Sequence, residues 1–129
     1  MTLLDTSVLI GALAGTKPLA PILQAVIASG ERLALCAPVL YEWLRGPRTD
    51  RERATQEELF PSDAAWPFGA AEAFIAAGLY QRVRRARQRD LDLAIAACAL
   101  ARGTRLWTLN VADFADVPDL SLYDPPARA

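Results

Sequence analysis

Histidine is absent from this sequence of 129 residues, lysine occurs once and cysteine twice. The absence of histidine removes the commonest general base and metal ligand of proteins. Catalytic triads and ribonuclease chemistry that moves protons through imidazole are therefore excluded, and so few lysines and cysteines leave little scope for Schiff-base or thiol chemistry. Carboxylates, hydroxyls and arginines remain, and these suit oxygen-preferring ions such as Mg²⁺ or Mn²⁺.

Long apolar runs are also lacking. A membrane span needs about 20 consecutive apolar residues, and no stretch approaches that length. The apolar start of the chain contains Asp5 and lacks the basic residues of a signal peptide. Cys36 and Cys98 lie in apolar stretches, which predicts small core residues in a reducing compartment. We expect a cytoplasmic protein with no membrane partner.

Neither sign of charge dominates the composition. The 14 basic and 15 acidic side chains give a net charge of -1, which argues against a uniformly basic surface for nucleic acid. A hydrophobic content of 53% with 22% charged residues is typical of a folded chain. A chain of this length predicts one domain, spanning residues 1–129.

Apolar runs typical of buried strands alternate with amphipathic helical patterns. Strands are predicted over residues 3–4, 33–36, 106–109 and 120–123, with a loop or edge strand at 60–61. Helices are predicted over residues 5–10, 18–30, 38–46, 50–59, 66–85, 91–102 and 110–114, with Phe74, Ile75, Leu79 and Val83 facing inward. This alternation predicts an α/β fold, a three-layer α/β/α sandwich with a mostly parallel central sheet.

Four acids stand at or near the ends of predicted elements. Asp5 ends the first strand, Glu42 lies in the helix at 38–46, Asp92 in the first turn of the most apolar helix, and Asp113 after the strand at 106–109. Because the carboxyl ends of parallel strands share one sheet edge, we expect these acids to open into one crevice. Converging carboxylates repel one another unless a divalent cation binds them. One or two Mg²⁺ ions there would activate water for attack on a phosphodiester.

Each acid also has an ordinary structural interpretation, and the residues alone leave it open. These interpretations are a helix cap for Asp5, a cap of the following turn for Asp113, helix-dipole stabilisation for Asp92 with Asp90 as the cap, and a surface ion pair with Arg45 for Glu42. Four acids expected on one edge nevertheless favour a common site.

Four segments, in order, resemble the motif blocks of PIN-domain ribonucleases, especially the VapC toxins of bacterial toxin–antitoxin pairs. The segments are LLDTSVLI at residues 3–10, YEWLRG at 41–46, DLAIAACAL at 92–100 and TLNVADF at 108–114. Two departures stand out. Residues 84–90 lack the glycine often found ahead of the third block, and Trp43 stands where leucine is commoner.

The resemblance implies a PIN-like fold and a Mg²⁺-dependent endoribonuclease, with Mn²⁺ as a substitute ion. It implies that Asp5, Glu42, Asp92 and Asp113 form the catalytic site, with Asp5, Asp92 and Asp113 as metal ligands. The resemblance also implies that Thr6, Ser7, Thr108 and Asn110 orient the carboxylates and bound waters or position the substrate. No role follows for Asp90.

Five of the thirteen arginines fall in one short run, at Arg82, Arg84, Arg85, Arg87 and Arg89. On a helix, Arg82, Arg85 and Arg89 share a face, whereas Arg87 falls toward the apolar side and predicts a break nearby. A solvated surface and a track for RNA phosphates are both open interpretations, the second because arginine suits bidentate phosphate contact. Arg82, Arg85 and Arg45 are the candidate RNA contacts.

Aromatic and alanine-rich segments bear on partners. Stacking on RNA bases is one interpretation of the aromatic residues, but a core or interface position is more typical of Trp43, Trp66, Phe68, Tyr80 and Trp107. The alanine-rich residues 64–77 indicate close helix packing, either in a homodimer or in a groove for an antitoxin helix. The family resemblance implies a small antitoxin that covers the acidic cleft.

Two other functions are considered. A catalytically inactive PIN-like module that binds RNA or protein is the main alternative, and the four acids argue against it. A phosphatase of the haloacid-dehalogenase type also places an aspartate after the first strand. That chemistry requires a second aspartate two residues on, where this chain has Ser7.

Overall fold

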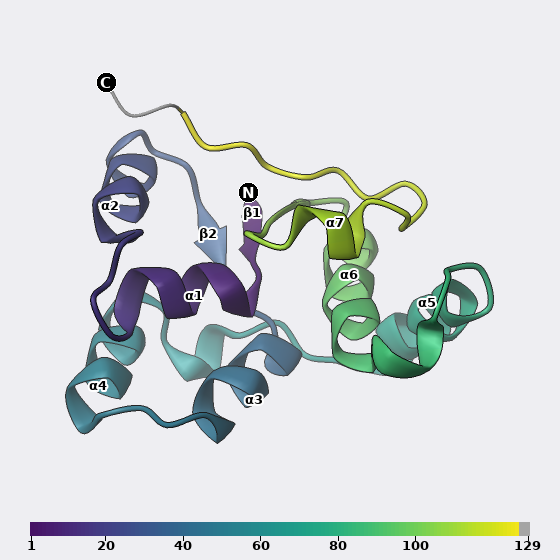
Figure 1. Cartoon of the computed structure of the whole chain (residues 1–129), viewed down its shortest axis with the longest axis horizontal. Coiled ribbons are helices and arrows are strands. Elements are labelled where there is room, and N and C mark those ends of the chain that lie inside the picture. The colour runs from purple at the N-terminus through teal and green to yellow at the C-terminus, as the bar shows by residue number, and fades with distance from the viewer. Residues whose placement is uncertain (127–129) are drawn as a thin grey trace.

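Three parallel strands form the sheet, in the order β2-β1-β3, in a computed structural model that describes residues 1–126 (Figure 1). The strands are β1 (Thr2–Leu4), β2 (Leu33–Ala34) and β3 (Arg105–Trp107). The central strand β1 is fully buried. Leu4 pairs with Trp107, and the amide of Asp5 donates to the carbonyl of Trp107 at 2.9 Å. The carboxyl end of β1 therefore reaches the sheet edge beside the end of β3.

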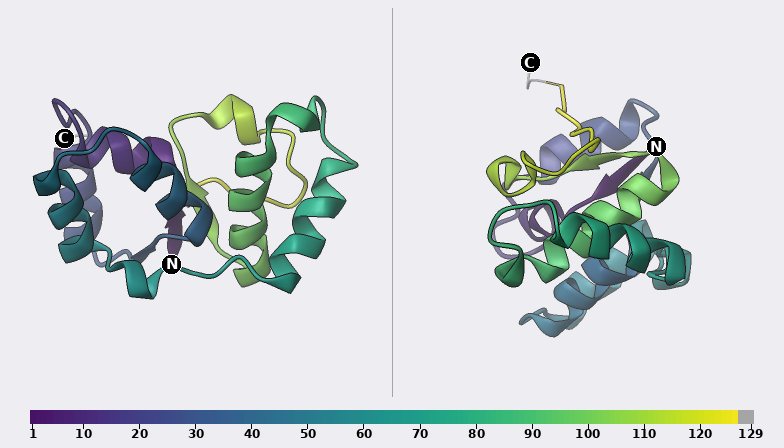
Figure 2. Two further views of the ribbon diagram at one scale, coloured as in Figure 1. Left: turned by 90° about the horizontal axis from the view of Figure 1, so that it is seen from below. Right: turned by 90° about the vertical axis from the view of Figure 1, so that its right-hand side faces the viewer.

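Helices cover both faces of this sheet. They are α1 (Thr6–Leu13), α2 (Ala20–Ala28), α3 (Ala37–Arg45), α4 (Asp50–Leu59), α5 (Ala70–Tyr80), α6 (Asp90–Arg102) and α7 (Val111–Phe114), with short 3₁₀ turns η1 (Ser62–Ala64) and η2 (Ala86–Gln88). In the right-hand view of Figure 2, α2 lies on one side of the sheet and α3, α5 and α6 on the other. The predicted sandwich with a parallel sheet is confirmed. Within residues 1–126, no helix is long and apolar enough to cross a bilayer.

The core combines sheet residues with the inward faces of the helices. Trp43, Trp107 and Phe114 are its largest members, and each is at most 2% exposed. Cys36 and Cys98 are buried free thiols, as their apolar surroundings predict. Because Trp43 and Trp107 are buried, their rings cannot stack on the bases of a bound RNA. The exposed aromatic side chains lie elsewhere, mainly on α5 and the segment that precedes it.

The helix predicted over residues 66–85 is much shorter in the structure. Trp66 instead forms an isolated parallel bridge with Cys36, and α5 ends at Tyr80. Arg85 has a left-handed φ of 52°, a conformation that a continuous right-handed helix does not contain. The prediction that Arg82, Arg85 and Arg89 share a helical face is therefore wrong.

Contact of α5 with the rest of the chain is mainly through α6. Leu79 is buried, and Ile75 and Val83 pack partly buried against the core, as predicted. Phe74 precedes Ile75 by one position and so points about 100° away around the helix. The prediction that Phe74 faces inward is wrong, since this side chain is 81% exposed.

The strand predicted over residues 120–123 is reduced to one parallel bridge between Leu106 and Leu122. The amide of Leu106 donates to Ser121, and the amide of Tyr123 donates to Leu106. Pairing stops there because Pro118 lies just upstream and residues 125–126 are both proline, which has no amide to donate. At residues 60–61, the chain forms a loop rather than an edge strand.

Two glycines are expected to respond oppositely to substitution by alanine. Gly103 ends α6 with a left-handed φ of 62°, whereas a Cβ added to Gly78, inside α5, meets nothing within 4 Å. We expect Gly103→Ala to lower the free energy of unfolding by about 1 kcal/mol, because the added Cβ strains the backbone. Gly78→Ala should raise it by about 0.5–1 kcal/mol. Urea titration measures both, and shifts of the same sign would contradict these conformations.

Candidate active site

Asp5 lies where β1 ends and α1 begins, and it is 3% exposed. The hydroxyls of Ser7 and Thr108 each donate a hydrogen bond of 2.7 Å to its Oδ2 atom. Although Asp5 occupies the N-cap position of α1, its side chain makes no capping hydrogen bond within the described residues. The interpretation of Asp5 as a simple cap is therefore wrong. Two hydroxyls orient its carboxylate and leave Oδ1 available to a ligand.

The same hydroxyls connect α1 to the segment that follows β3. The Ser7 hydroxyl accepts a hydrogen bond from the main-chain amide of Leu109 at 3.0 Å. It also lies 3.4 Å from the Thr108 hydroxyl. The Thr108 hydroxyl accepts one from the amide of Asn110 at 3.0 Å. Asn110 thus contributes its main chain, not its side-chain amide, to this network. Residues about a hundred positions apart in the sequence hold the Asp5 carboxylate in one orientation.

Glu42 projects from α3 toward the start of α1. The Thr6 hydroxyl donates a hydrogen bond of 2.7 Å to its Oε1 atom. On the outer side, Arg45 Nη2 lies 3.6 Å from Glu42 Oε2. The guanidinium of Arg45 also lies 5.2 Å from the centroid of the Tyr41 ring. The predicted ion pair with Arg45 is thus present, and it coexists with a contact that directs Glu42 toward Asp5.

Asp92 lies in the first turn of α6 and is half-buried. The pKa of its carboxyl group is raised to about 6, first by burial and then by the negative charges of Asp5, Asp113 and Glu42, while Arg89 lowers it. These acids come from four elements that are distant in the sequence, and the charges of Asp5, Glu42 and Asp113 act on Asp92. The part of the molecule that holds these four acids is called the acidic region below.

Two of the proposed capping roles do not hold. Asp113 is the third residue of the short helix α7, whose N-cap is Asn110, and its side chain is exposed. Asp90 is the first residue of α6, whose N-cap is Arg89. Both acids lie in the first turn of a helix, where the dipole favours negative charge.

The acidic region fits a hard divalent cation by donor type. Its donors are carboxylate oxygens surrounded by hydroxyl groups, the ligand chemistry that Mg²⁺ and Mn²⁺ prefer. Burial and, after it, repulsion by the other carboxylates raise the pKa of Asp92, and a cation would relieve this repulsion. Within residues 1–126, no three acidic or cysteine side chains converge closely enough to enclose an ion.

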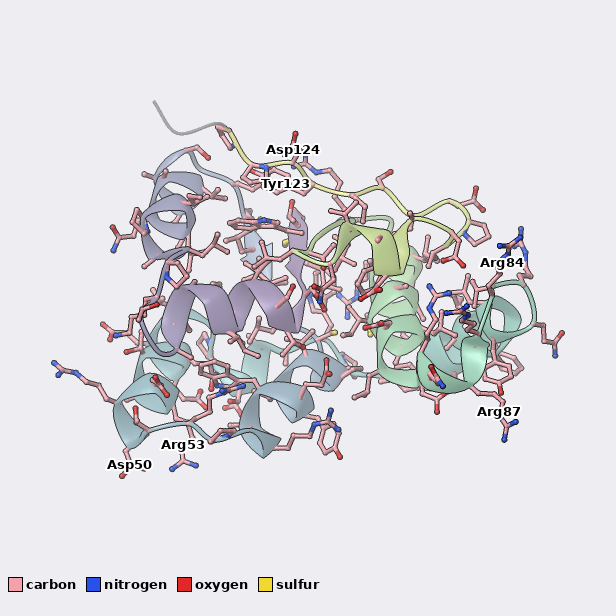
Figure 3. All side chains as sticks on the ribbon, viewed as in Figure 1. Asp50, Arg53, Arg84, Arg87, Tyr123 and Asp124 are labelled. Atoms are coloured by element: carbon pink, nitrogen blue, oxygen red, sulfur yellow. The ribbon has the colours of Figure 1, made fainter. Side chains whose placement is uncertain are left out.

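A groove of about 480 Å³ adjoins this region. Acidic and basic side chains line it together with the start of α6: Glu42, Arg45, Arg87, Gln88, Arg89, Asp90, Leu91 and Asp92. Of the predicted RNA contacts, Arg45 lines the groove, whereas Arg82 and Arg85 lie outside its lining. Arg87, which the predicted helix directed toward the apolar side, lines it instead. Figure 3 shows Arg84 and Arg87 projecting outward from the segment between α5 and α6.

Comparison with known proteins identifies the family. A family model described as PIN domain matches residues 2–120. Ribonuclease VapC19 of Mycobacterium tuberculosis (strain CDC 1551 / Oshkosh) is 33% identical over 123 residues, which cover 93% of this chain and 97% of that protein. The chain is a PIN domain of the VapC family. The resemblance carried by the four sequence segments is confirmed.

Solved structures with low sequence identity share the fold of this PIN domain. DNA-bound VapBC from Salmonella typhimurium matches with a TM-score of 0.75 and 19% identity over 95% of this chain and 96% of that one. A toxin-antitoxin complex from Klebsiella pneumoniae matches with a TM-score of 0.71 and 24% identity over 96% of this chain and 99% of that one. The sheet and helices described above are therefore the PIN fold.

One ion pair of this PIN domain was not expected from the sequence. Arg89 and Asp116 form a bidentate pair at 2.7 and 2.9 Å immediately beside the turn that carries Asp113. Arg89 was grouped with four other arginines, and Asp116 follows the last motif block without a pattern of its own. Because the partners lie 27 positions apart, local spacing gave no signal for their contact.

Proposed function

We propose that this chain is a Mg²⁺-dependent endoribonuclease that acts as the toxin of a toxin–antitoxin pair, with Mn²⁺ able to replace Mg²⁺. The observation that carries the proposal is the buried Asp5 carboxylate, held by two hydroxyls at the end of the central strand, whose charge helps to raise the pKa of Asp92. The name of the relative VapC19, a ribonuclease, supports RNA as the substrate.

Four carboxylates share the catalytic work in this proposal. Asp5, Asp92 and Asp113 bind the metal, and Glu42 is the fourth catalytic acid. The bound ion supplies activation of water and neutralisation of the charge that develops on the phosphodiester. The hydroxyls of Ser7, Thr108 and Thr6 fix the orientations of Asp5 and Glu42, while the Asn110 amide holds Thr108 in place. These carboxylates then need little rearrangement to engage the ion.

RNA reaches the acids through the groove beside α6. The guanidinium groups of Arg45 and Arg87 line this groove and suit contact with phosphate oxygens. Arg82 and Arg85 lie on the exposed segment that continues from it, and we propose that they contact phosphates farther from the cleavage position. The small net charge of the chain is compatible with this path, because a sum over the whole chain does not set the charge of the arginines that line one groove.

Proteins are the other proposed partners. The solved structures with the same fold include toxin-antitoxin complexes, which supports a cognate antitoxin that covers the acidic cleft. The exposed face of α5, where Phe74 is 81% and Tyr80 42% exposed, is the proposed contact between two copies of this chain. We propose that residues 1–129 act as one PIN-like domain in the cytoplasm, where the RNA substrate is found.

Incubation of the purified chain with total RNA tests the proposed activity. We expect fragments with defined 5′ ends in Mg²⁺, their loss in EDTA, and their return when excess Mg²⁺ or Mn²⁺ is added. Sequencing the 5′ ends gives the substrate and the cleavage position. A folded chain that cleaves no RNA in Mg²⁺ would instead favour the catalytically inactive module that binds RNA or protein.

A further inference from the structure

Arg89 connects three segments around the acidic site. Its side chain is only 14% exposed, and its Nη1 atom donates to the carbonyl of Arg84 at 2.9 Å. Its Nη2 atom donates to the carbonyl of Asp113 at 2.6 Å, and both nitrogens bind the carboxylate of Asp116. The guanidinium thus ties together the segment before α6, helix α7 and the turn that follows α7.

The backbone of Arg89 belongs to the start of α6. Its carbonyl accepts the first hydrogen bond of this helix, from the amide of Leu93 at 2.9 Å, one residue beyond Asp92. The main-chain position of Asp92 is therefore fixed relative to Arg89. The guanidinium of the same residue holds the main chain of Asp113. One residue consequently spans the two helices that carry two of the proposed metal ligands.

Helix α7 has few other attachments. It is four residues long, and Phe114 is its one buried residue. Asp113 is exposed, so no packing of its own side chain fixes where this carboxylate lies. The bonds from Arg89 to the Asp113 carbonyl and to Asp116 are the polar ties that hold α7 toward α6.

We propose that Arg89, anchored by Asp116, is a positioning residue that sets the spacing between Asp92 and Asp113 and thereby the affinity of the site for a divalent cation. This inference rests on the proposed metal site and adds to it a residue that acts through the main chain of α6 and α7, the helices that carry Asp92 and Asp113. Groups that orient metal ligands typically change metal affinity by about 10- to 100-fold when they are replaced.

Electrostatics alone predicts the opposite effect of removing Arg89. A guanidinium near the acids repels a divalent cation, so its loss would tighten cation binding if charge were its whole contribution. A positioning role predicts weaker binding when the arginine is lost. The direction of the change therefore distinguishes the two roles.

Arg89→Lys separates geometry from charge most cleanly. Lysine keeps the positive charge, but a single ammonium group cannot bind the carbonyls of Arg84 and Asp113 together with both oxygens of Asp116. We expect the Kd for Mn²⁺, measured by calorimetry on the metal-free chain, to rise about tenfold in Arg89→Lys and at least as much in Arg89→Gln. An unchanged Kd in Arg89→Lys, or tighter binding by Arg89→Gln, would overturn the proposal.

Matched controls account for charge and folding. Asp116→Asn should also weaken Mn²⁺ binding, whereas Asp119→Asn removes the same charge three residues on and should leave the Kd within about twofold of the wild type. Asparagine is also tolerated at the left-handed φ of 64° found at Asp119. Circular dichroism establishes that each variant is folded. If Arg89→Gln fails to fold, Arg89→Lys carries the test.

Failure of this inference differs from failure of the proposed activity. Wild-type chain that binds Mn²⁺ but cleaves no RNA, with weaker binding by Arg89→Lys, would refute the ribonuclease and support the positioning role. Cleavage by the wild type with an unaltered Kd for Mn²⁺ in Arg89→Lys would support the ribonuclease and refute the positioning role. Wild-type chain that bound no Mn²⁺ would refute both the metal site and this inference.

Discussion

Asp5→Asn is expected to lower the rate of Mg²⁺-dependent RNA cleavage by roughly a thousandfold or more, with little change in stability. Loss of a metal ligand removes several kcal/mol of transition-state stabilisation, and about 4 kcal/mol corresponds to a thousandfold in rate. Asparagine has the shape of aspartate, and its carbonyl oxygen can accept the bonds from Ser7 and Thr108. The fold should therefore remain intact.

Single-turnover cleavage with saturating Mg²⁺ measures this loss, and thermal unfolding without metal measures stability. Asp124→Asn is a suitable control because this substitution removes the same charge. Asp124 is exposed and lies near the end of the described chain (Figure 3). Cleavage by Asp5→Asn at the wild-type rate would refute the proposed site. Loss of cleavage in Asp5→Asn, purified in the same way as the wild type, also excludes contamination by another nuclease.

Asp92→Asn is expected to abolish cleavage while stabilising the metal-free protein at neutral pH. The pKa of Asp92 is raised to about 6 in the folded chain, above the ordinary value of 3.8, mainly because of burial. The folded state therefore holds this proton more tightly than the unfolded state does, so stability falls as pH rises through this interval. The neutral amide avoids that cost. For a half-buried group, we expect a gain of about 1 kcal/mol, or a few degrees in Tm.

Thermal unfolding of the wild type and Asp92→Asn between pH 4 and 8 in EDTA tests the direction of this change in stability. The stability difference between the two proteins should be smallest near pH 4 and should grow up to about pH 7. Comparison of the two proteins cancels the titration of carboxyl groups whose pKa values are lowered, such as Asp116 beside Arg89. Added Mg²⁺ should raise the Tm of the wild type more than that of the variant. Lower stability of Asp92→Asn at pH 7 would contradict the raised pKa of Asp92 and the unfavourable burial of its charge.

For two of the four candidate acids, simple sequence geometry predicts a common edge of the sheet. Asp5 and Asp113 follow strands, and parallel strands bring their carboxyl ends to one edge. Thr108 directly follows β3, and the hydrogen bond from its hydroxyl to Asp5 supports the positioning role that the family resemblance implies. The buried run before Asp5 was enough to place the central strand.

Tertiary contacts explain where sequence reasoning failed. Residues 81–89 are rich in good helix formers, and local propensity predicted a helix that continued into them. In the structure, the ion pair between Arg89 and Asp116 and the left-handed backbone at Arg85 accompany the end of this helix. Such contacts join positions far apart in the sequence, and propensity contains no information about them. The exposure of Phe74 has a related cause, because α5 packs mainly on one neighbour.

The position of β3 beside β1 has a consequence for synthesis of the protein. Asp5 leaves the ribosome 103 residues before Thr108, whose hydroxyl holds its carboxylate, and it also precedes the third strand, which borders it. Until translation has passed Trp107, the nascent chain lacks a strand of the sheet, and until it has passed Asp113 and Asp116, it lacks part of the proposed site. A chain that ends early is therefore expected to be harmless to the RNA of the cell that makes it.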